Sequence, residues 1–161
     1  MPEPLYIWLL PDPPAYGVLS SVIRDLSAVY GCPGFLPHVT LASGKGAIGS
    51  AAVELPLLPA PLVTLGSAET GETRTHCLYL PASVDQAFLD LRQAASNAFG
   101  FQAPSPAPHL SLLYGDLGMA SRKDIARSLP LREMEVRLGR IAVVSGGEDI
   151  RSWRITRQPS L

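Results

Sequence analysis

The chain has 161 residues, 47% of them hydrophobic and 17% charged, which is long and apolar enough for a folded domain and argues against disorder. The formal net charge of −1 gives no overall attraction to nucleic acid or to an anionic membrane. Residues 122–161 nevertheless hold nine of the 13 basic side chains, eight of them arginine. This region could supply local anion contacts or form an ordinary solvated surface, and the sequence leaves both open.

The N-terminus is unlike a signal peptide, because its apolar run over 5–10 is short and flanked by prolines. No apolar stretch approaches the roughly 20 residues that a membrane-spanning helix needs. Cys32 and Cys77 match no zinc-binding spacing, and although one disulfide is possible, we expect two reduced thiols. We therefore expect a cytoplasmic protein with no membrane contact, and we expect a monomer.

The N-terminal third predicts a strand, a helix and a second strand. A short apolar run predicts a strand over 5–10, and apolar residues at helical spacing predict a helix over 16–30 that ends at Gly31. A second strand is expected over 36–42. The glycine-rich stretch 43–52 lacks the frame of a P-loop and predicts a connection. The expected apolar stripe of the helix comprises Val18, Leu19, Val22, Ile23, Leu26, Val29 and Tyr30.

The remaining residues predict hairpins and two further helices. A strand pair at 62–69 and 75–80 precedes a helix that begins at Ser83, where a glutamine three residues later completes a capping box. The apolar pattern over 134–144 changes parity at Gly139, which predicts one long strand with a bulge. The other expected elements are a strand at 108–115, a helix at 120–129 and a strand at 150–156.

Strands outnumber helices in this order, and many follow one another directly. The order therefore predicts an α+β fold with mainly antiparallel sheets rather than a doubly wound parallel sheet. We treat 1–161 as a single domain. A repeated pentapeptide suggests two related halves within it, 1–60 and 61–161.

The pentapeptides PHVTL and PHLSL contain two of the three histidines of the chain. Residues i and i+2 of a strand project to the same face, so His38 projects together with Thr40. The same spacing brings His109 together with Ser111. The aliphatic residues between them face the opposite side, which suits a core. Two such strands facing one cleft would form a site of two imidazoles and two hydroxyls.

This set of groups suits transfer at phosphorus. The ordinary pKa of histidine is about 6.5, so near neutral pH one imidazole can accept a proton from the attacking oxygen while the other donates one to the leaving oxygen. The hydroxyls can donate to the non-bridging phosphate oxygens. Such chemistry requires no metal, and the sequence has no metal-ligand spacing such as HExxH. We expect neither a metal nor another cofactor.

The motifs resemble those of the two-histidine (2H) phosphoesterase superfamily, and within it the cyclic nucleotide phosphodiesterases of plants and yeast. The strings that carry the resemblance are YIWLLPD at 6–12, LPHVTLA at 36–42 and PHLSLLYG at 108–115. The resemblance implies a bilobal fold with pseudo-twofold symmetry, in which two antiparallel sheets face a central cleft and the helices lie outside. It implies metal-independent hydrolysis of 2′,3′-cyclic nucleotides, to the 2′-phosphate, or of ADP-ribose 1″,2″-cyclic phosphate.

The resemblance also assigns roles to the four motif residues. His38 and His109 would be the catalytic pair, with His109 activating water and His38 protonating the leaving oxygen. Thr40 and Ser111 would bind the phosphate of the substrate.

Tyr114 and Trp8 match family positions near the substrate. Tyr114 has the opposite strand parity to His109, so it reaches the cleft only if the strand ends or twists there, and a core or edge tyrosine stays open. Trp8 could stack on a base or simply pack in the core. His76 has a leucine at its +2 position, and we interpret it as structural.

Two other functions stay open. Relatives in the superfamily process RNA ends as 2′,5′-ligases or oligonucleotide exonucleases, which need a groove for a polyanion. The net charge argues against this function, while the C-terminal arginines keep it open. A non-catalytic module that binds a nucleotide phosphate is the third hypothesis. We expect a small-molecule cyclic phosphate as the substrate, with RNA ends as the alternative partner.

Overall fold

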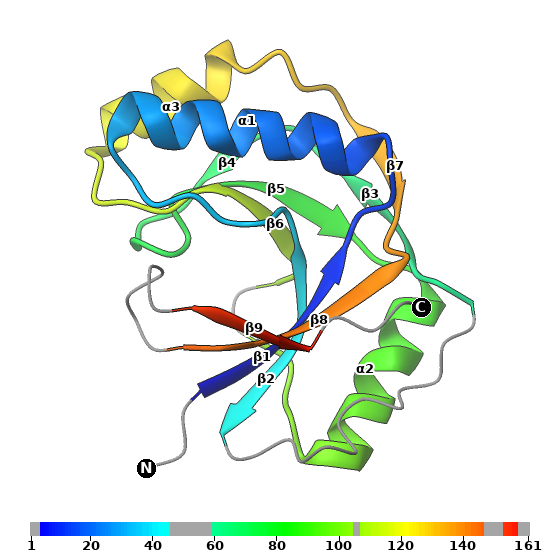
Figure 1. The fold of residues 1–161 in the computed structure, drawn as a ribbon. Coiled ribbons are helices and arrows are strands. Elements are labelled where there is room, and N and C mark those ends of the chain that lie inside the picture. The colour runs from blue at the N-terminus through cyan, green and yellow to red at the C-terminus, as the bar shows by residue number, and fades with distance from the viewer. Residues whose placement is uncertain (1–3, 46–58, 105–106, 147–152, 158–161) are drawn as a thin grey trace.

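The computed structural model describes residues 4–45, 59–104, 107–146 and 153–157. Every strand ladder among them is antiparallel, which confirms the α+β fold with mainly antiparallel strands (Figure 1). Most of the glycine-rich connection expected at 43–52 lies outside these residues. The elements, in chain order, are β1 (Pro4–Leu10), α1 (Ala15–Tyr30), β2 (Val39–Lys45), β3 (Leu62–Leu65), β4 (Glu69–Thr70), β5 (Leu78–Ser83), α2 (Gln86–Phe99), β6 (His109–Leu113), α3 (Met119–Ser128), β7 (Met134–Arg137), β8 (Arg140–Ser145) and β9 (Arg154–Arg157).

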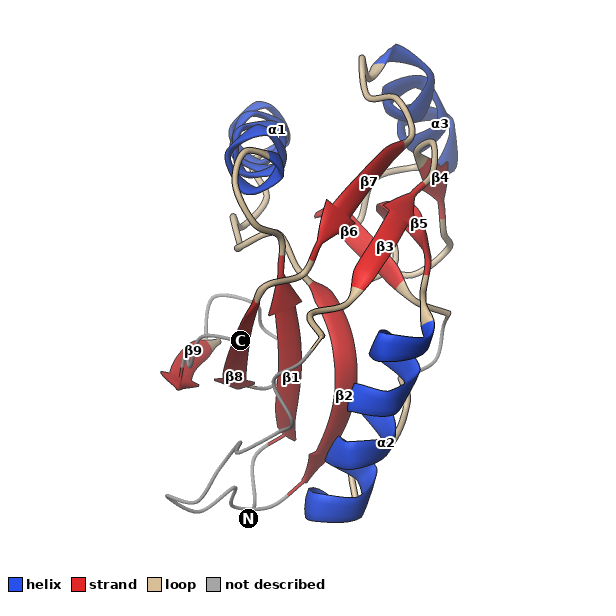
Figure 2. Ribbon diagram, turned by 90° about the vertical axis from the view of Figure 1, so that its right-hand side faces the viewer, coloured by secondary structure: helices blue, strands red, loops and turns tan. Residues whose placement is uncertain are grey.

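The strands follow the order β7-β3-β5-β6-β2-β1-β8-β9, with β4 paired to β5. The two strands at the middle of this order, β2 and β6, meet through one residue pair, Val39 with Leu110. Around this junction the strands diverge into two groups, one of β1, β2, β8 and β9 and the other of β3 to β7 (Figure 2). The junction pair consists of the central aliphatic residues of the two repeated pentapeptides.

Helices α1 and α2 each pack against the group of strands to which their neighbours in the chain do not belong. Helix α1 follows β1 in the chain but packs against β6, and α2 follows β5 but packs against β2. Gly31 ends α1 in the left-handed conformation that favours glycine, with φ of 65°, and its N–H donates to the carbonyl of Ser27. The expected apolar stripe of α1 is too wide, because Val18, Val29 and Tyr30 are exposed.

Helix α2 begins later than the sequence predicts. Ser83 pairs with Thr64 as the last residue of β5, so it is unavailable as a helix cap. Asp85 is the cap instead, since its carboxylate accepts a hydrogen bond from the backbone N–H of Phe88. A second oxygen of Asp85 accepts from the N–H of Leu62 and ties the helix start to β3.

The single strand expected over 134–144 is two strands, β7 and β8. Strand β7 pairs with β3, whereas β8 pairs with β1 in the other group. The parity change at Gly139 therefore marks a crossing between the groups and not a bulge. Because β8 and β9 return to the side of β1, the groups of strands do not correspond to the sequence halves 1–60 and 61–161.

Both faces of β1 are covered, which explains its continuous apolar run. The odd-numbered residues Leu5, Ile7 and Leu9 lie in the main core beneath the helices, together with buried aliphatic residues of β2, β5, β6 and β8. Trp8 and Leu10 belong to a second, smaller cluster, against which Tyr6 and Trp153 pack.

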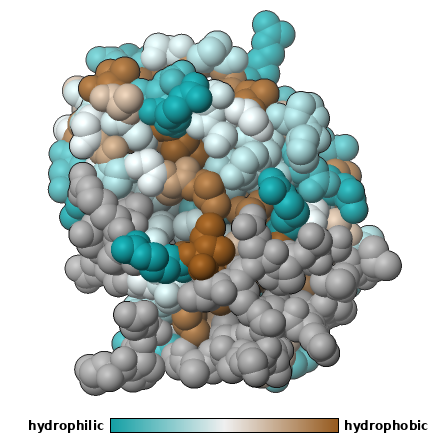
Figure 3. Space-filling model, viewed as in Figure 1, coloured by the Kyte–Doolittle hydropathy of each residue, from teal (hydrophilic) through white to brown (hydrophobic). Residues whose placement is uncertain are grey.

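On the face shown in Figure 3, hydrophobic side chains near the centre are bordered by hydrophilic ones. No helix in the described part of the chain combines the length and the apolar character needed to cross a membrane.

Candidate active site

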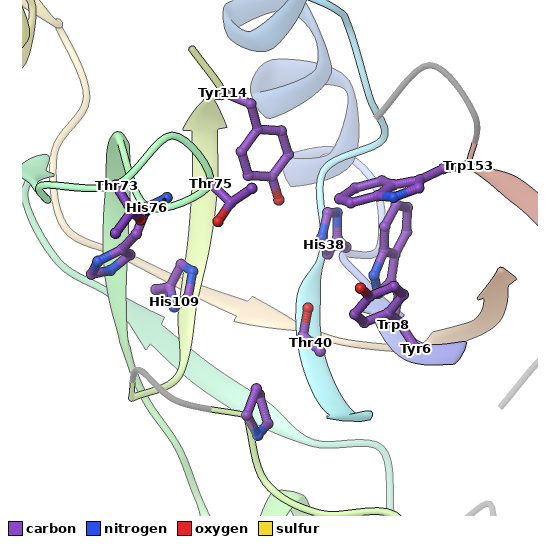
Figure 4. Close-up of a pocket in the computed structure, with 11 residues that line it drawn as sticks. Tyr6, Trp8, His38, Thr40, Thr73, Thr75, His76, His109, Tyr114 and Trp153 are labelled. Carbon is purple, nitrogen blue, oxygen red and sulfur yellow. Dashed lines mark hydrogen bonds between the residues drawn. The ribbon is translucent and has the colours of Figure 1, made fainter. Parts of the chain in front are cut away.

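A cavity of about 540 Å³ lies between the two groups of strands (Figure 4). Five of the six residues expected at the site line it, and Ser111 is not among its lining residues. The five are Trp8, His38, Thr40, His109 and Tyr114. The other lining residues are Tyr6, Thr73, Thr75, His76, Pro104 and Trp153.

The register of the junction brings the two motifs together. Strands β2 and β6 are antiparallel and pair at Val39 and Leu110. His38 and Thr40 flank Val39, and His109 and Ser111 flank Leu110, so the four motif residues are the neighbours of this pair.

The proline of each pentapeptide orients the histidine that follows it. His38 Nδ1 lies 2.7 Å from the carbonyl oxygen of Leu36, and His109 Nδ1 lies 2.8 Å from that of Ala107. Both carbonyls belong to the residue before the proline, a position that proline restricts to extended backbone. A carbonyl oxygen only accepts, so Nδ1 carries the hydrogen and donates it. Nε2 of each ring is thereby left for a substrate.

The leucine of each pentapeptide forms a bulge. Leu41 is skipped in the pairing of β2 with β1, because its two neighbours pair with consecutive residues of β1. Leu112 is skipped in the same way in the pairing of β6 with β5. Such an extra residue changes which side chains face each side of the sheet. Tyr114, two residues after the second bulge, consequently lines the cavity with His109 despite their opposite parity in the sequence.

His38 is held against an aromatic ring in the wall of the cavity. Its imidazole stacks on the indole of Trp8, with ring centroids 3.5 Å apart and planes 8° from parallel, and only 4% of the residue is exposed. Burial lowers the pKa of His38 to about 3; the hydrogen bond to Leu36 opposes this shift and the nearby His109 adds to it. The His38 imidazole is therefore neutral at neutral pH unless an anion binds beside it.

Aromatic rings gather on the His38 side of the cavity, as Figure 4 shows. The ring of Trp153 lies 5.3 Å from that of Trp8 and 5.8 Å from that of Tyr6. We call Tyr6, Trp8 and Trp153 the aromatic wall. Tyr6 could have been found from its i, i+2 relation to Trp8 on one strand, whereas no local pattern marks Trp153.

Tyr114 and Ser111 form a unit at the cavity. The Tyr114 ring packs against Phe35 and Trp153, and its hydroxyl extends toward the space between the histidines (Figure 4). Burial raises the pKa of Tyr114 to about 12, and a hydrogen bond with the Ser111 hydroxyl opposes the shift. The phenol therefore stays protonated as a donor. Ser111 is 2% exposed.

The His109 side of the cavity carries polar groups from the loop before β5. Thr73, Thr75 and His76, which we call the polar wall, all line it. The His76 ring stacks on Tyr79 at 3.9 Å and meets His109 edge-on at 4.7 Å. Burial lowers the pKa of His76, and His109 adds to the shift. His76, which the sequence led us to interpret as structural, therefore also lines the cavity. The residue at its +2 position could not indicate this, because the position of its loop depends on the tertiary structure.

Arginines of the C-terminal quarter make structural contacts in the described part of the chain. Arg122 is bound to backbone carbonyls, Arg137 pairs with Asp12, and Arg140 lies over the ring of Tyr16. The described residues that line the cavity include no lysine or arginine. Cys32 and Cys77 are free thiols, as expected.

No group of three or more histidine, cysteine, aspartate or glutamate side chains that could hold a metal occurs among the described residues.

No protein-family model matches the chain. The curated cyclic phosphodiesterase of Arabidopsis thaliana is 26% identical to it over 124 residues, which cover 73% of this chain and 68% of that protein.

Solved structures share the fold. Escherichia coli LigT in its apo form has a TM-score of 0.58 and 19% identity, covering 99% of this chain and 98% of LigT. A protein of Thermus thermophilus has a TM-score of 0.59 and 16% identity, covering 100% of this chain and 98% of that one. LigT has also been solved with 3′-AMP, ATP and NADP+. At these identities the likeness concerns the fold.

Proposed function

We propose that the chain is a 2H phosphoesterase that hydrolyses 2′,3′-cyclic nucleotides, to the 2′-phosphate, or ADP-ribose 1″,2″-cyclic phosphate, because its sequence is similar to a cyclic phosphodiesterase and its fold to that of LigT. The observation that carries the proposal is a cavity lined by both motif histidines. In each, Nδ1 donates to a backbone carbonyl, which makes Nε2 the nitrogen that can act on a substrate. The curated relative is named a cyclic phosphodiesterase, and LigT binds nucleotides in its solved complexes.

In this proposal the phosphate lies between His38 and His109. Thr40, which lines the cavity together with both histidines, donates a hydrogen bond to a non-bridging oxygen. The protonated phenol of Tyr114 is a second donor, and Ser111 orients that phenol. Ser111, expected from the sequence to bind the phosphate, acts in this proposal through its hydrogen bond to Tyr114.

The aromatic wall determines how the substrate is oriented between the two histidines. Its rings offer a flat apolar surface for a nucleobase, so the nucleoside and its leaving oxygen lie on the His38 side. The attacking water then lies across the phosphorus, on the His109 side. His109 takes a proton from water as the new oxygen–phosphorus bond forms. The bond from phosphorus to O3′ breaks, and His38, which gains a proton when the anionic phosphate binds, donates that proton to O3′. His109 then releases its proton to solvent, so the net reaction consumes only water.

Phosphorus NMR tests the proposed function. The purified protein is incubated with 2′,3′-cyclic AMP in the presence of EDTA, and we expect conversion to 2′-AMP. His38→Asn and His109→Asn should each lower kcat by at least about 100-fold, because each removes one proton transfer. Glu72→Gln, an exposed change on the loop before β5, serves as the control.

Three outcomes contradict the proposal. Near-wild-type rates in both histidine variants exclude the assigned catalytic pair. Binding of the cyclic nucleotide without turnover indicates a non-catalytic module. Turnover confined to oligonucleotides, with an affinity that falls steeply with salt, indicates an enzyme of RNA ends.

A further inference from the structure

The loop that carries the polar wall is held by hydrogen bonds from a buried arginine to its backbone carbonyls. Arg122, in α3, is 6% exposed. Its guanidinium donates to the carbonyl oxygens of Gly71 at 2.7 Å and Thr73 at 3.0 Å within the loop. It also donates to Leu117 at 2.7 Å and to Gly115 at 3.4 Å, in the segment that follows β6. These bonds fasten the polar wall to the strand that carries His109.

The His76 imidazole is enclosed on several sides within this loop. Its backbone N–H donates to the hydroxyl of Thr73, and its ring stacks on Tyr79 with planes 17° apart. A Cβ added at Gly71 would lie 2.6 Å from Nδ1 of His76, so only glycine permits this close approach. The ring is thereby held edge-on to His109, 4.7 Å between centroids.

The two walls of the cavity differ in what they can bind. The aromatic wall has large apolar faces, whereas the polar wall has two hydroxyls and an imidazole. A neutral imidazole has one acceptor and one donor nitrogen, so it can accept a hydrogen bond from water. Burial and His109 both lower the pKa of His76, which keeps this acceptor available at neutral pH. The polar wall is therefore suited to holding a water molecule next to His109.

We propose that His76 positions the attacking water by accepting the hydrogen bond from its second O–H, while His109 takes the proton of the first. The inference rests on the proposed function and on the role of His109 as the base within it. His76 neither gains nor loses a proton during the step. Its contribution is to hold the water oxygen in line with the phosphorus and the leaving O3′.

Methanol separates this role from a purely structural one. Methanol has a single O–H, which His109 would deprotonate to form a methyl phosphodiester, and it has no second O–H for His76. The wild-type protein in water–methanol mixtures should therefore favour hydrolysis of 2′,3′-cyclic AMP over methanolysis. His76→Phe keeps a ring against Tyr79 but removes the acceptor.

We expect His76→Phe to lower kcat for hydrolysis about ten- to a hundredfold with little change in KM, and to shift the product ratio toward the methyl ester. If the phenylalanine variant does not fold, the ratio of methyl ester to hydrolysis product is measured in His76→Ala instead. His76→Gln, which retains an acceptor, should keep the ratio near that of the wild type, and Glu72→Gln should change neither quantity.

The outcomes are distinguishable. A wild-type product ratio in His76→Phe or His76→Ala overturns the inference even where kcat falls, because a structural defect slows both reactions alike. Unchanged kcat and product ratio also overturn it. If the wild-type protein fails to turn over 2′,3′-cyclic AMP, the proposed function fails first and the inference fails with it.

Discussion

His38 combines burial with a place beside the proposed phosphate. Its pKa of about 3 means that it must gain a proton before it can act as an acid. A bound anion favours the charged imidazole and raises this pKa, because opposite charges within about 4–6 Å stabilise each other. Anion binding and proton uptake are therefore coupled at this residue, and the direction of the coupling reports which histidine is the acid.

We expect sulfate, whose charge is constant between about pH 5 and 7, to bind with uptake of up to one proton. Calorimetry in two buffers of different ionisation enthalpy measures the number of protons, and His38→Asn should reduce it. Binding without proton uptake would mean that His38 stays neutral. The roles of His38 and His109 would then be reversed.

Helix α3 contains two arginines with different roles. Arg122 is buried and satisfies several backbone carbonyls, whereas Arg127 is exposed and forms an ion pair with Asp124 one turn away. Removing Arg122 leaves buried acceptors without partners, while an exposed ion pair contributes little to stability.

Arg122→Gln should lower the free energy of unfolding by about 2–4 kcal/mol, and Arg127→Gln should change it by less than about 0.5 kcal/mol. Denaturant titration of the two variants measures both values. Equal effects would show that the carbonyl contacts of Arg122 do not stabilise the loop as we infer.

The elements predicted correctly from the sequence depend on local residue patterns, whereas those predicted wrongly depend on pairing with residues far away in the chain. Strand β1 and the end of α1 at Gly31 follow from local apolar pattern and glycine conformation. The start of α2 was misplaced because pairing of Ser83 in the sheet outweighs its local capping preference. The chain over 134–144 was misjudged because the partners of β7 and β8 lie in different groups of strands.

Across the whole molecule, the crossing of the helices ties the two groups of strands together. Each group is covered by a helix whose neighbours in the chain belong to the other group, since α1 packs on β6 and α2 on β2. The last strands, β8 and β9, also return to β1. Neither group therefore has a complete core of its own, and we propose that residues 1–161 form one domain.

This arrangement predicts a single unfolding transition. Trp8 and Trp153 both belong to the β1 side, so tryptophan fluorescence reports that group, whereas far-UV circular dichroism reports all the helices and strands. The two denaturation curves should coincide, as for a two-state domain. Distinct midpoints for the two signals would indicate two independently unfolding parts.

By itself, the sequence determined the pairing of imidazole and hydroxyl on two strands, because the alternation of side chains along a strand is a local property. The same local alternation predicted that His38, Thr40 and His109 lie on strand faces that could meet. Only the tertiary structure decided that the buried Ser111 hydroxyl bonds to Tyr114 and that the His76 ring lies beside His109. Those outcomes depend on a bulge at Leu112 and on a loop fastened by Arg122, and both arise from contacts between residues far apart in the chain.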